Sequence, residues 1–205
     1  MTLKPVITKI PTDYGNFWFF GFKIDNQEVL VIATKKNPKN GANIRLHSSC
    51  FTSEIFGSLK CDCADQLKEF MILMNKNRRD DYLLIYFLNH EGRGIGLFNK
   101  LRAYEAQRKF NLDTYQANEY LGLPHDMRDY SPVIEILRYF NLTKVNLFSN
   151  NLTKLEFLKK NGIIVNIKNF FVKPKSQYAF QYLLAKAKKG SYIIKNINLK
   201  YSRLN

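Results

Sequence analysis

A short apolar run that leads directly into a glycine-rich segment is the strongest constraint on the fold of this chain. The run, YLLIYFL, spans residues 82–88, and NHEGRGIGLFNK follows it at residues 89–100. An apolar run of this length predicts a strand that is buried on both faces. The glycines predict a loop, and the residues after them predict a helix. Such a junction belongs in an α/β fold, where the backbone amides of the loop can face a ligand.

Strand and helix patterns alternate along the rest of the chain. β-rich segments that predict strands lie at residues 6–10, 16–24, 28–34, 44–47, 145–149 and 163–167. Helical patterns cover residues 64–76, 129–141 and 151–160, and the first of them places Leu67, Phe70, Met71 and Met74 on one face. Asn161-Gly162 is a helix stop. We therefore expect an α/β fold, with a mixed sheet core flanked by helices and a β-rich N-terminal part.

The distribution of charge divides the chain into a nearly neutral body and a basic end. The net charge is +15, yet residues 157–205 contain eleven Lys or Arg and no acidic residue. We expect a domain over residues 1–170 and a basic C-terminal extension over residues 171–205, in which QYLLAKAKK forms a helix. A basic tail can hold nucleic acid or phosphate by charge alone, whereas the simpler interpretation is a solvated face in a Lys/Asn-rich chain.

No segment predicts export or membrane insertion. The first residues, MTLKPVITKI, lack the apolar stretch of a secretory signal, and no apolar run reaches the roughly 18 residues of a membrane span. We therefore expect a soluble, cytoplasmic protein. In that compartment the three cysteines are better explained by thiol chemistry or metal binding than by disulfides.

The three cysteines lie within one short stretch, Cys50, Cys61 and Cys63, in the pattern C-x10-C-x-C. Zn²⁺ prefers thiolate and imidazole ligands, and catalytic sites use three protein ligands with a water in the fourth position. Three thiolates match that arrangement, and a bound zinc lowers the pKa of its water towards about 7. Two alternatives stay open: three free buried thiols, or a structural site completed by His47.

Two further segments carry groups suited to binding and catalysis. The glycines at 92, 94 and 96 fit neither the dinucleotide fingerprint nor the P-loop, but Glu91 could bind a base edge and Arg93 a phosphate. The alternative is an ordinary strand–helix turn. In HDMRDY, residues 125–130, Asp126 and Arg128 could act as a proton acceptor and an anion clamp. Spacing alone favours a helix N-terminus there, with Asp in the first turn.

Five motifs in this order and spacing resemble the GTP cyclohydrolase II family. They cover about residues 43–165: RLHSSC with CDC, EGRGIGLFNKLRAY, DTYQANEYLG, DMRDY, and SNN with Lys154. The resemblance implies hydrolysis of GTP to 2,5-diamino-6-ribosylamino-4(3H)-pyrimidinone 5′-phosphate, formate and pyrophosphate, the first step of riboflavin synthesis. It also implies one Zn²⁺ on Cys50, Cys61 and Cys63, a requirement for Mg²⁺, and a homodimer.

The resemblance assigns roles residue by residue. Asp126 matches a proton acceptor, and Tyr104 matches a tyrosine close to the zinc. Arg128 matches a proposed nucleophile towards the α-phosphate, but a guanidinium stays protonated, so we expect it to stabilise charge in the transition state. The residues that match the GTP-binding positions are Arg45, Leu46, His47, Ser48, Ser49, Gln66, Glu91, Gly92, Arg93, Thr114, Ser149 and Lys154.

The chain departs from the family pattern at a few positions beside the nucleotide. Ser49 stands where the family has Glu, Asn89-His90 replaces Arg-Gln, Leu152-Thr153 replaces Pro-Lys, and Ser149 replaces Thr but keeps the hydroxyl. These changes leave two alternatives beside GTP cyclohydrolase II. One is a related zinc nucleotide hydrolase that stops at the ring-opened formamide or uses another purine nucleotide. The other is a non-enzymatic protein that binds nucleic acid through its basic tail.

Overall fold

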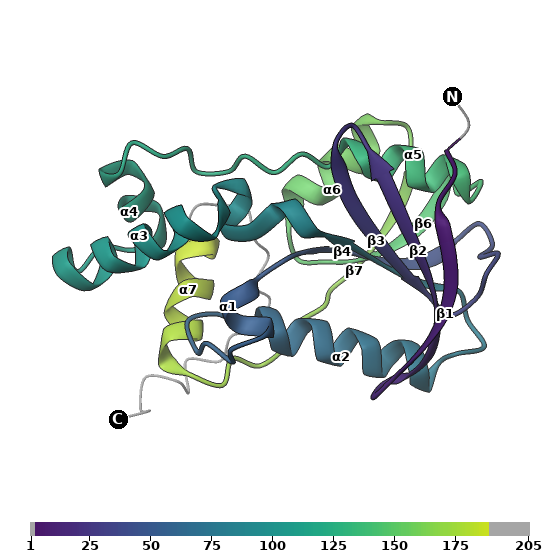
Figure 1. The fold of residues 1–205 in the computed structure, drawn as a ribbon, viewed down its shortest axis with the longest axis horizontal. Coiled ribbons are helices and arrows are strands. Elements are labelled where there is room, and N and C mark those ends of the chain that lie inside the picture. The colour runs from purple at the N-terminus through teal and green to yellow at the C-terminus, as the bar shows by residue number, and fades with distance from the viewer. Residues whose placement is uncertain (1–2, 189–205) are drawn as a thin grey trace.

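A seven-stranded mixed sheet forms the centre of the protein, and the computed structural model describes residues 3–188 of it (Figure 1). The strand order is β1-β2-β3-β5-β4-β6-β7. Three N-terminal strands form an antiparallel meander that pairs with β5: β1 (Val6–Thr12), β2 (Gly15–Ile24) and β3 (Gln27–Ala33). The other strands run parallel to one another: β4 (Ala42–Ser48), β5 (Tyr82–Phe87), β6 (Lys144–Phe148) and β7 (Ile164–Lys168).

The meander follows from tight turns between alternating strands. Asp25 and Asn26 join β2 to β3, and both have a positive φ, 46° and 63°. Asn and Asp tolerate this region, and a two-residue turn of this kind matches the twist of the flanking strands. Ile24 therefore pairs with Gln27 across the turn. The predicted β-rich N-terminal part is confirmed.

Helices cover both faces of the sheet and bury two apolar clusters. Helix α2 (Cys63–Lys76) packs Phe70, Met71 and Met74 against one face. Helices α5 (Ser131–Tyr139) and α6 (Leu152–Lys160) cover the other face. Figure 1 shows α2 on one side of the sheet and α5 with α6 on the opposite side. This arrangement confirms the predicted mixed α/β fold with flanking helices.

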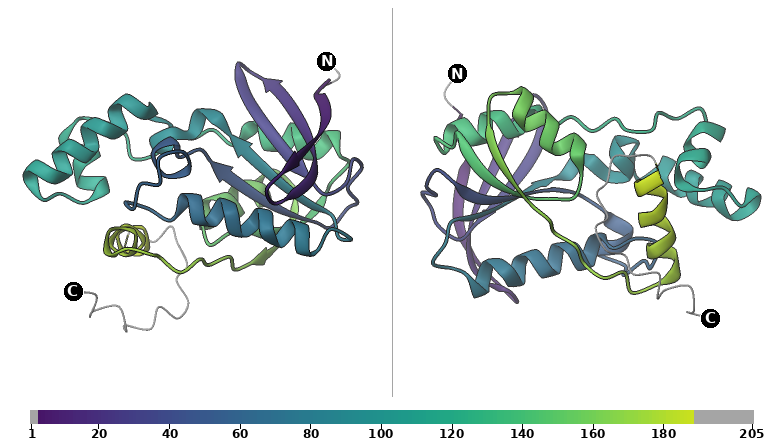
Figure 2. Two further views of the ribbon diagram at one scale, coloured as in Figure 1. Left: turned by 60° about the horizontal axis from the view of Figure 1, so that its bottom comes forward. Right: turned by 180° about the vertical axis from the view of Figure 1, so that it is seen from behind.

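The remaining helices lie beyond one end of the sheet, at the carboxyl ends of the parallel strands. They are α1 (Phe51–Glu54), the 3-10 segment η1 (Leu88–Gly94), α3 (Gly96–Phe110), α4 (Thr114–Tyr120) and α7 (Gln177–Lys188). Both views of Figure 2 place α7 at the same end of the molecule as α3 and α4. Ligands bind at the carboxyl ends of strands in open α/β sheets, so this end positions the site.

Most predicted elements are present, with a few differences at their ends. The predicted helix 129–141 begins at Ser131, because residues 125–130 are not helical. Helix α4 was not predicted, although Asp113 and Gln116 form a capping box at its start. The basic helix predicted for QYLLAKAKK, residues 181–189, corresponds to α7, which begins earlier, at Gln177, and the part of the extension after residue 188 lies outside the described residues. None of the helices in the described part combines the length and apolar character needed to cross a membrane.

Candidate active site

One cavity of about 800 Å³ opens at the carboxyl ends of β4, β5 and β6. Every site residue that the sequence predicted contributes to its lining. These residues are Arg45, Leu46, His47, Ser48, Ser49, Cys50, Cys61, Cys63, Gln66, Glu91, Gly92, Arg93, Tyr104, Thr114, Asp126, Arg128, Ser149 and Lys154. Residues that are up to about a hundred positions apart in the chain therefore meet in a single space.

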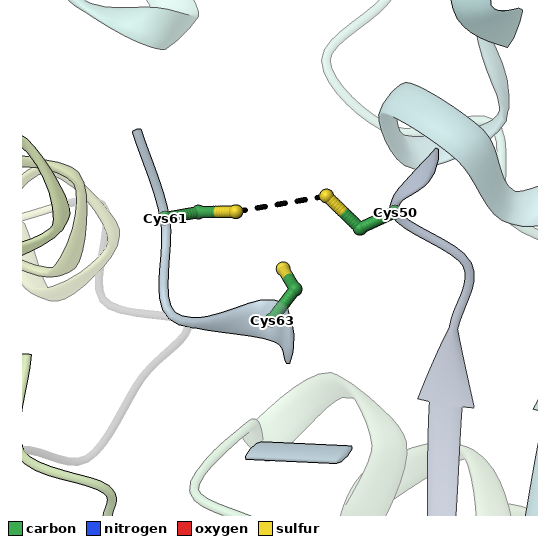
Figure 3. A group of neighbouring side chains, drawn as sticks. All are labelled: Cys50, Cys61 and Cys63. Carbon is green, nitrogen blue, oxygen red and sulfur yellow. Dashed lines mark hydrogen bonds between the residues drawn. The ribbon is translucent and has the colours of Figure 1, made fainter. Parts of the chain in front are cut away.

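The three cysteines converge on one point of the cavity wall (Figure 3). Their Sγ atoms all lie within 4.8 Å of one another, and those of Cys50 and Cys61 are 3.6 Å apart. Cys50 follows β4, Cys63 begins α2, and Cys61 lies in the turn before that helix. All three are free thiols. The turn between Cys61 and Cys63 thus brings both sulfurs to the side where Cys50 lies.

This donor set fits a zinc ion. Zinc–sulfur bonds of about 2.3 Å in a tetrahedral shell separate the sulfurs by about 3.8 Å. The Cys50–Cys61 distance of 3.6 Å is close to that separation without any rearrangement. Three thiolates leave one tetrahedral position for water, which is the arrangement of catalytic zinc sites.

The cluster favours a thiolate at Cys50. Hydrogen bonds from Cys61 and Cys63 lower the pKa of Cys50, and the nearby charge of Lys100 lowers it further. The same hydrogen bonds raise the pKa of Cys63, because a second thiolate would lie beside the first. A bound cation would remove that penalty, since metal binding and thiol deprotonation are coupled.

A buried cation, Lys100 on α3, is in contact with the cysteine cluster. Its Nζ donates to Cys50 Sγ over 3.1 Å and to Glu91 Oε1 over 2.6 Å. Burial opposes its charge, but Cys50, Tyr104 and Glu91 together raise the pKa of Lys100 above its ordinary value. Lys100 was not predicted as a site residue. Its position nine residues after Glu91, about one helical turn into α3, was the only available signal.

Glu91 is held by the protein on both carboxylate oxygens. Oε2 accepts from Phe51 N over 2.6 Å, and Oε1 accepts from Gly92 N as well as from Lys100. The carboxylate therefore links the glycine loop to the segment that carries Cys50. A contact between Glu91 and a base edge would have to share these oxygens with the existing donors.

The glycine loop adopts backbone conformations that admit close contacts. Gly92, Arg93 and Gly94 have φ values of 60°, 62° and 88°. A side chain at Gly94 would meet the backbone of Met127 at 3.0 Å, and Met127 N donates to Arg93 O over 2.9 Å. The glycine is required here because the loop that carries Asp126 and Arg128 lies directly against it. The glycine loop is therefore more than an ordinary strand–helix turn, because it also packs against the loop that carries Asp126 and Arg128.

Asp126 and Arg128 form a two-pronged ion pair at the cavity wall. Arg128 Nε donates to Asp126 Oδ1 over 2.8 Å, and Nη2 donates to Oδ2 over 2.5 Å. Burial would raise the pKa of Asp126, but the hydrogen bonds and charge of Arg128 lower it below the ordinary value. Spacing had favoured a helix N-terminus at 125–130, and that interpretation is wrong, because these residues form an irregular loop ahead of α5.

Lys154 brings a second buried cation to the same wall. It is on the first turn of α6, and its Nζ donates to Leu46 O over 2.7 Å. Burial lowers the pKa of Lys154 well below its ordinary value, and the charges of Arg128, Arg45 and Lys186 lower it further. Ser149 lies just before α6, where its Oγ accepts from Asn151 N. An anion bound here would favour the charged form of Lys154.

Arg45 and Gln66 form a buried polar pair beneath the cavity. Arg45 donates to Gln66 Oε1 and, through Nη1, to Phe148 O over 3.1 Å, and its guanidinium lies 4.6 Å from the Phe170 ring centroid. Gln66 Nε2 donates to Asp62 Oδ2 over 2.5 Å. Both ends of the Gln66 amide are engaged, so a substrate contact would replace one of these protein partners.

His47 is engaged by neighbouring side chains. Its Nε2 lies 2.8 Å from Glu54 Oε1, and its ring stacks on Tyr86 at 5.5 Å between centroids. Within the described residues, the metal-binding group comprises the three cysteines and does not include His47. The geometry therefore favours the catalytic three-thiol arrangement over a structural site completed by His47.

Each of the four departures from the family pattern contributes a residue to the cavity lining: Ser49, His90, Ser149 and Thr153. Ser49 Oγ donates to Leu88 O over 2.9 Å. His90 stacks on Phe87 at 4.3 Å between centroids, and its Nε2 donates to Asp129 O over 2.9 Å. Its Nδ1 is then the acceptor for Ser48 Oγ at 3.3 Å, and Ser48 Oγ accepts in turn from Arg128 Nη1. Burial lowers the pKa of His90 to about 4, so its ring is neutral. His90 thus helps to orient Arg128, whereas Asn89 is exposed and outside the lining.

Tyr104 and Thr114 complete the predicted set. The Tyr104 ring centroid lies 5.8 Å from Lys100 Nζ and 4.7 Å from Lys60 Nζ, so this tyrosine is next to the cysteine cluster. Burial raises the pKa of Tyr104, and its hydroxyl remains protonated. Thr114 is the first residue of α4 and also lines the cavity.

The sequence did not predict that α7 forms part of the lining. Tyr178, Gln181, Tyr182, Ala185 and Lys186 all line the cavity from this helix. No motif marked them, and the only available signal was the aromatic and basic composition of QYLLAKAKK.

The fold and the cavity define an α/β protein in which a cluster of three thiols that could hold a metal ion lies beside a strongly basic wall. The sequence model of the GTP cyclohydrolase II family matches residues 4–169, and the chain belongs to that family.

Curated relatives agree with this assignment. The chain is similar to the riboflavin biosynthesis protein RibBA of Staphylococcus epidermidis, with 41% identity over 91% of this chain and 46% of the relative. RibBA of Staphylococcus aureus gives the same values. The chain therefore spans about half the length of the curated relatives it matches. A solved structure, RibBX from A. baumannii, described as a two domain 3,4-dihydroxy-2-butanone 4-phosphate synthase, has a TM-score of 0.45 and 13% identity over 84% of this chain and 41% of that chain.

Proposed function

We propose that this protein is a GTP cyclohydrolase II, which hydrolyses GTP to 2,5-diamino-6-ribosylamino-4(3H)-pyrimidinone 5′-phosphate, formate and pyrophosphate. One observation carries the proposal: the three converging thiols and the Asp126–Arg128 pair line the same cavity of about 800 Å³. Such a volume accommodates a nucleotide, since ligand pockets of about 300–1,000 Å³ bury drug-sized molecules. Family membership gives independent support.

Cys50, Cys61 and Cys63 would hold the zinc ion. A zinc ion held by these thiolates would supply hydroxide at neutral pH, the nucleophile that hydrolysis at C8 of guanine needs. Lys100 donates to Cys50 Sγ and so reduces the charge of the thiolate cluster. Tyr104 lies on the same side, with a protonated hydroxyl that can donate a hydrogen bond to the developing formyl oxygen.

The basic wall would bind the triphosphate. Arg93, Arg128 and Lys154 all line the cavity, and Asp126 is the carboxylate that pairs with Arg128. We propose that Mg²⁺ enters with the triphosphate, because Mg²⁺ is usually held by substrate phosphates together with one or two carboxylates.

The ion pair gives Asp126 and Arg128 linked tasks. While Arg128 holds Asp126, the lowered pKa of Asp126 makes it a weak proton acceptor. When Arg128 turns towards the α-phosphate, Asp126 loses its partner and its basicity rises. Phosphate binding would thereby prepare the carboxylate to take a proton, and Arg128 would stabilise the charge that develops on the phosphate.

The test is an assay on purified protein with a measured zinc content. GTP and Mg²⁺ are added, and formate, pyrophosphate and the nucleotide product are identified by mass. Both small products, at one zinc per chain, are expected, and Cys61→Ser should lose zinc and formate release together. Absence of both products from zinc-loaded protein would refute the proposal.

A second candidate is a related hydrolase that stops at the ring-opened formamide. Ser49 and His90 favour it, because both line the cavity where the family has Glu and Gln. The same assay distinguishes the two functions: pyrophosphate without formate, and a product that retains the formyl carbon, would indicate the second. Repeating the assay with other purine nucleoside triphosphates in place of GTP tests the substrate specificity.

We also propose a homodimer, which the apolar residues exposed on α3 and α4 support: Phe98, Leu101, Phe110 and Tyr120. Light scattering after gel filtration measures the oligomeric state.

The division into a catalytic domain, residues 1–170, and a basic extension stays a prediction, as does a cytoplasmic location. Nucleic-acid binding by the extension should weaken steeply with salt if it occurs, and a filter-binding titration tests that dependence.

A further inference from the structure

Helix α7 lies beyond the residues that match the family, 4–169, and yet it forms part of the cavity. Its lining residues follow a helical spacing, so one face of the helix points inward. They are Tyr178, Gln181, Tyr182, Ala185 and Lys186. Figure 2 shows α7 near α3 and α4 at the open end of the sheet.

Several contacts fix α7 in this position. Leu183 and Ala179, one helical turn apart, are 0% and 2% exposed, so they anchor the helix on the body. Ser176 Oγ accepts from Ala179 N at the start of the helix and donates to Leu59 O over 2.5 Å. Lys175 pairs with Asp65 on the first turn of α2. The segment is therefore tied both to α2 and to the loop before the last two cysteines.

The inward face of α7 adds a cation and an aromatic ring to the basic wall. Lys186 Nζ lies 4.0 Å from the centroid of the Tyr182 ring, and the guanidinium of Arg93 lies 5.8 Å from the same centroid. Arg93 also lies 4.2 Å from the Tyr115 ring centroid. Tyr182 is thus in contact range of both cations and holds them at one end of the cavity.

The charge of Lys186 reaches the other cations of the wall. Lys186, like Arg128 and Arg45, contributes to lowering the pKa of Lys154. Several positive charges therefore act on one space, and a polyanion bound there would favour the charged form of Lys154. A chain of phosphates is the ligand that relieves this repulsion at several points at once.

We propose that α7 closes the phosphate end of the cavity and that Lys186, held by Tyr182, is a positioning residue for the terminal phosphates of a nucleoside triphosphate. That the ligand is a nucleoside triphosphate rests on the proposed function. That Lys186 lies in the cavity wall follows from the contacts of α7 and does not depend on that function. Helix α7 then belongs to the substrate site, and it favours triphosphates over monophosphates.

The experiment compares Lys186→Ala with Lys188→Ala, an exposed lysine two residues away that does not line the cavity. Binding of inorganic tripolyphosphate is measured by calorimetry at about 0.15 M salt, where exposed charges act only over about 8 Å. KM and kcat for GTP are measured on the same proteins. Lys186→Ala should weaken tripolyphosphate binding and raise KM on the order of tenfold, with kcat nearly unchanged, as expected for one charge-assisted hydrogen bond. Lys186→Arg should restore most of the affinity.

Each outcome separates this inference from the proposed function. Equal affinities for Lys186→Ala and Lys188→Ala would overturn the inference, even if GTP is turned over. Failure of the wild-type protein to bind tripolyphosphate would also overturn it. Tripolyphosphate binding that depends on Lys186, in a protein that does not turn over GTP, would support the inference and refute the proposed function. Binding of GMP should not depend on Lys186.

Discussion

The two ends of the cavity differ in how their charges are balanced. At the sulfur end, which we define as Cys50, Cys61, Cys63, Lys100 and Glu91, the cation has anionic partners: Lys100 lies 2.6 Å from Glu91 and 3.1 Å from Cys50. At the basic end, which we define as Arg93, Arg128, Lys154 and Lys186, Asp126 is the carboxylate in direct contact with a cation of the group. The sulfur end can accept a cation, and the basic end can accept a polyanion.

The difference shows how one cavity can treat two parts of a substrate differently. Burial lowers the pKa of both Lys100 and Lys154, but the anionic neighbours of Lys100 raise its pKa above the ordinary value, whereas the cationic neighbours of Lys154 lower its pKa further. Both are lysines at the cavity wall, so the neighbouring charges decide the direction in which each pKa shifts. Changes at one end should therefore leave the binding properties of the other end intact.

The largest effect is expected when the sulfur end loses one thiol. Cys63→Ser removes one of three converging ligands, so bound zinc and formate release should both disappear. Tripolyphosphate affinity, a property of the basic end, should stay close to that of the wild type. Metal analysis and calorimetry measure the two properties. A variant that retains a full zinc equivalent would contradict the assignment of Cys63.

Lys100→Met should destabilise the protein strongly. It leaves the Glu91 carboxylate buried without its cation, which costs about 3–5 kcal/mol of unfolding free energy for a broken buried pair. Zinc affinity should also fall, by about 10–100-fold, because Lys100 supports a metal ligand. Urea unfolding and competition with a chelator measure the two effects.

The control for Lys100 is Lys109→Met, which removes an exposed ion pair with Glu105 on the same helix. That variant should leave the unfolding free energy unchanged within error, since exposed pairs contribute little. Equal effects of the two substitutions would show that burial of the Lys100 pair has no special role.

Arg128→Lys tests the basic end at its ion pair. The charge remains, but the two-pronged contact with Asp126 and the contact with Ser48 are lost. We expect kcat to fall by about 10²–10³ and the zinc content to stay at one per chain. The pH–rate profile should also shift, because the pKa of Asp126 rises towards its ordinary value. Unchanged kcat would remove Arg128 from the catalytic group.

Lys154 should take up a proton when a polyanion binds. Burial and the neighbouring cations lower the pKa of Lys154 in the free protein, and phosphates nearby favour the charged form. Calorimetry of tripolyphosphate binding over a series of pH values, in buffers of different ionisation enthalpy, should show proton uptake on binding. Lys154→Met should abolish that uptake, and uptake that persists would assign the proton to another group.

The smallest effect concerns His90. Its pKa is lowered to about 4 by burial, whereas the unfolded chain binds the same proton near pH 6.5. The unfolded state therefore holds more protons between these values, and stability should fall as pH decreases from about 6.5 to 4, by at most about 1.4 kcal/mol per pH unit. His90→Gln should remove this part of the slope in thermal unfolding, and His125→Gln, an exposed histidine, should not.

Local patterns predicted most of the secondary structure and the composition of the site. The spacing of Phe70, Met71 and Met74 predicted the face of α2 that is buried, because helical periodicity is a property of consecutive residues. The pattern of Cys50, Cys61 and Cys63 predicted a metal cluster for the same reason, since a single turn brings the last two together. The residues that the family motifs singled out all line one cavity in the structure.

Predictions failed where distant contacts decide the conformation. Residues 125–130 have the spacing of a helix N-terminus, but Gly94 lets the backbone of this segment pack against the glycine loop, and the segment forms an irregular loop. The role of Lys100 was missed because its partners, Glu91 and Cys50, meet it only after α3 packs on the end of the sheet.

The sequence by itself determined which segments are strands and helices and which residue types carry the chemistry, because these follow from local periodicity and from the ligand preferences of thiols and cations. Only the tertiary structure decided how the ends of the elements meet. The placement of β4 between β5 and β6 brings Lys154 Nζ to Leu46 O, and the anchoring of Leu183 turns Lys186 into the cavity. Such contacts join residues far apart in the chain, so they depend on the packing of the whole sheet and its helices.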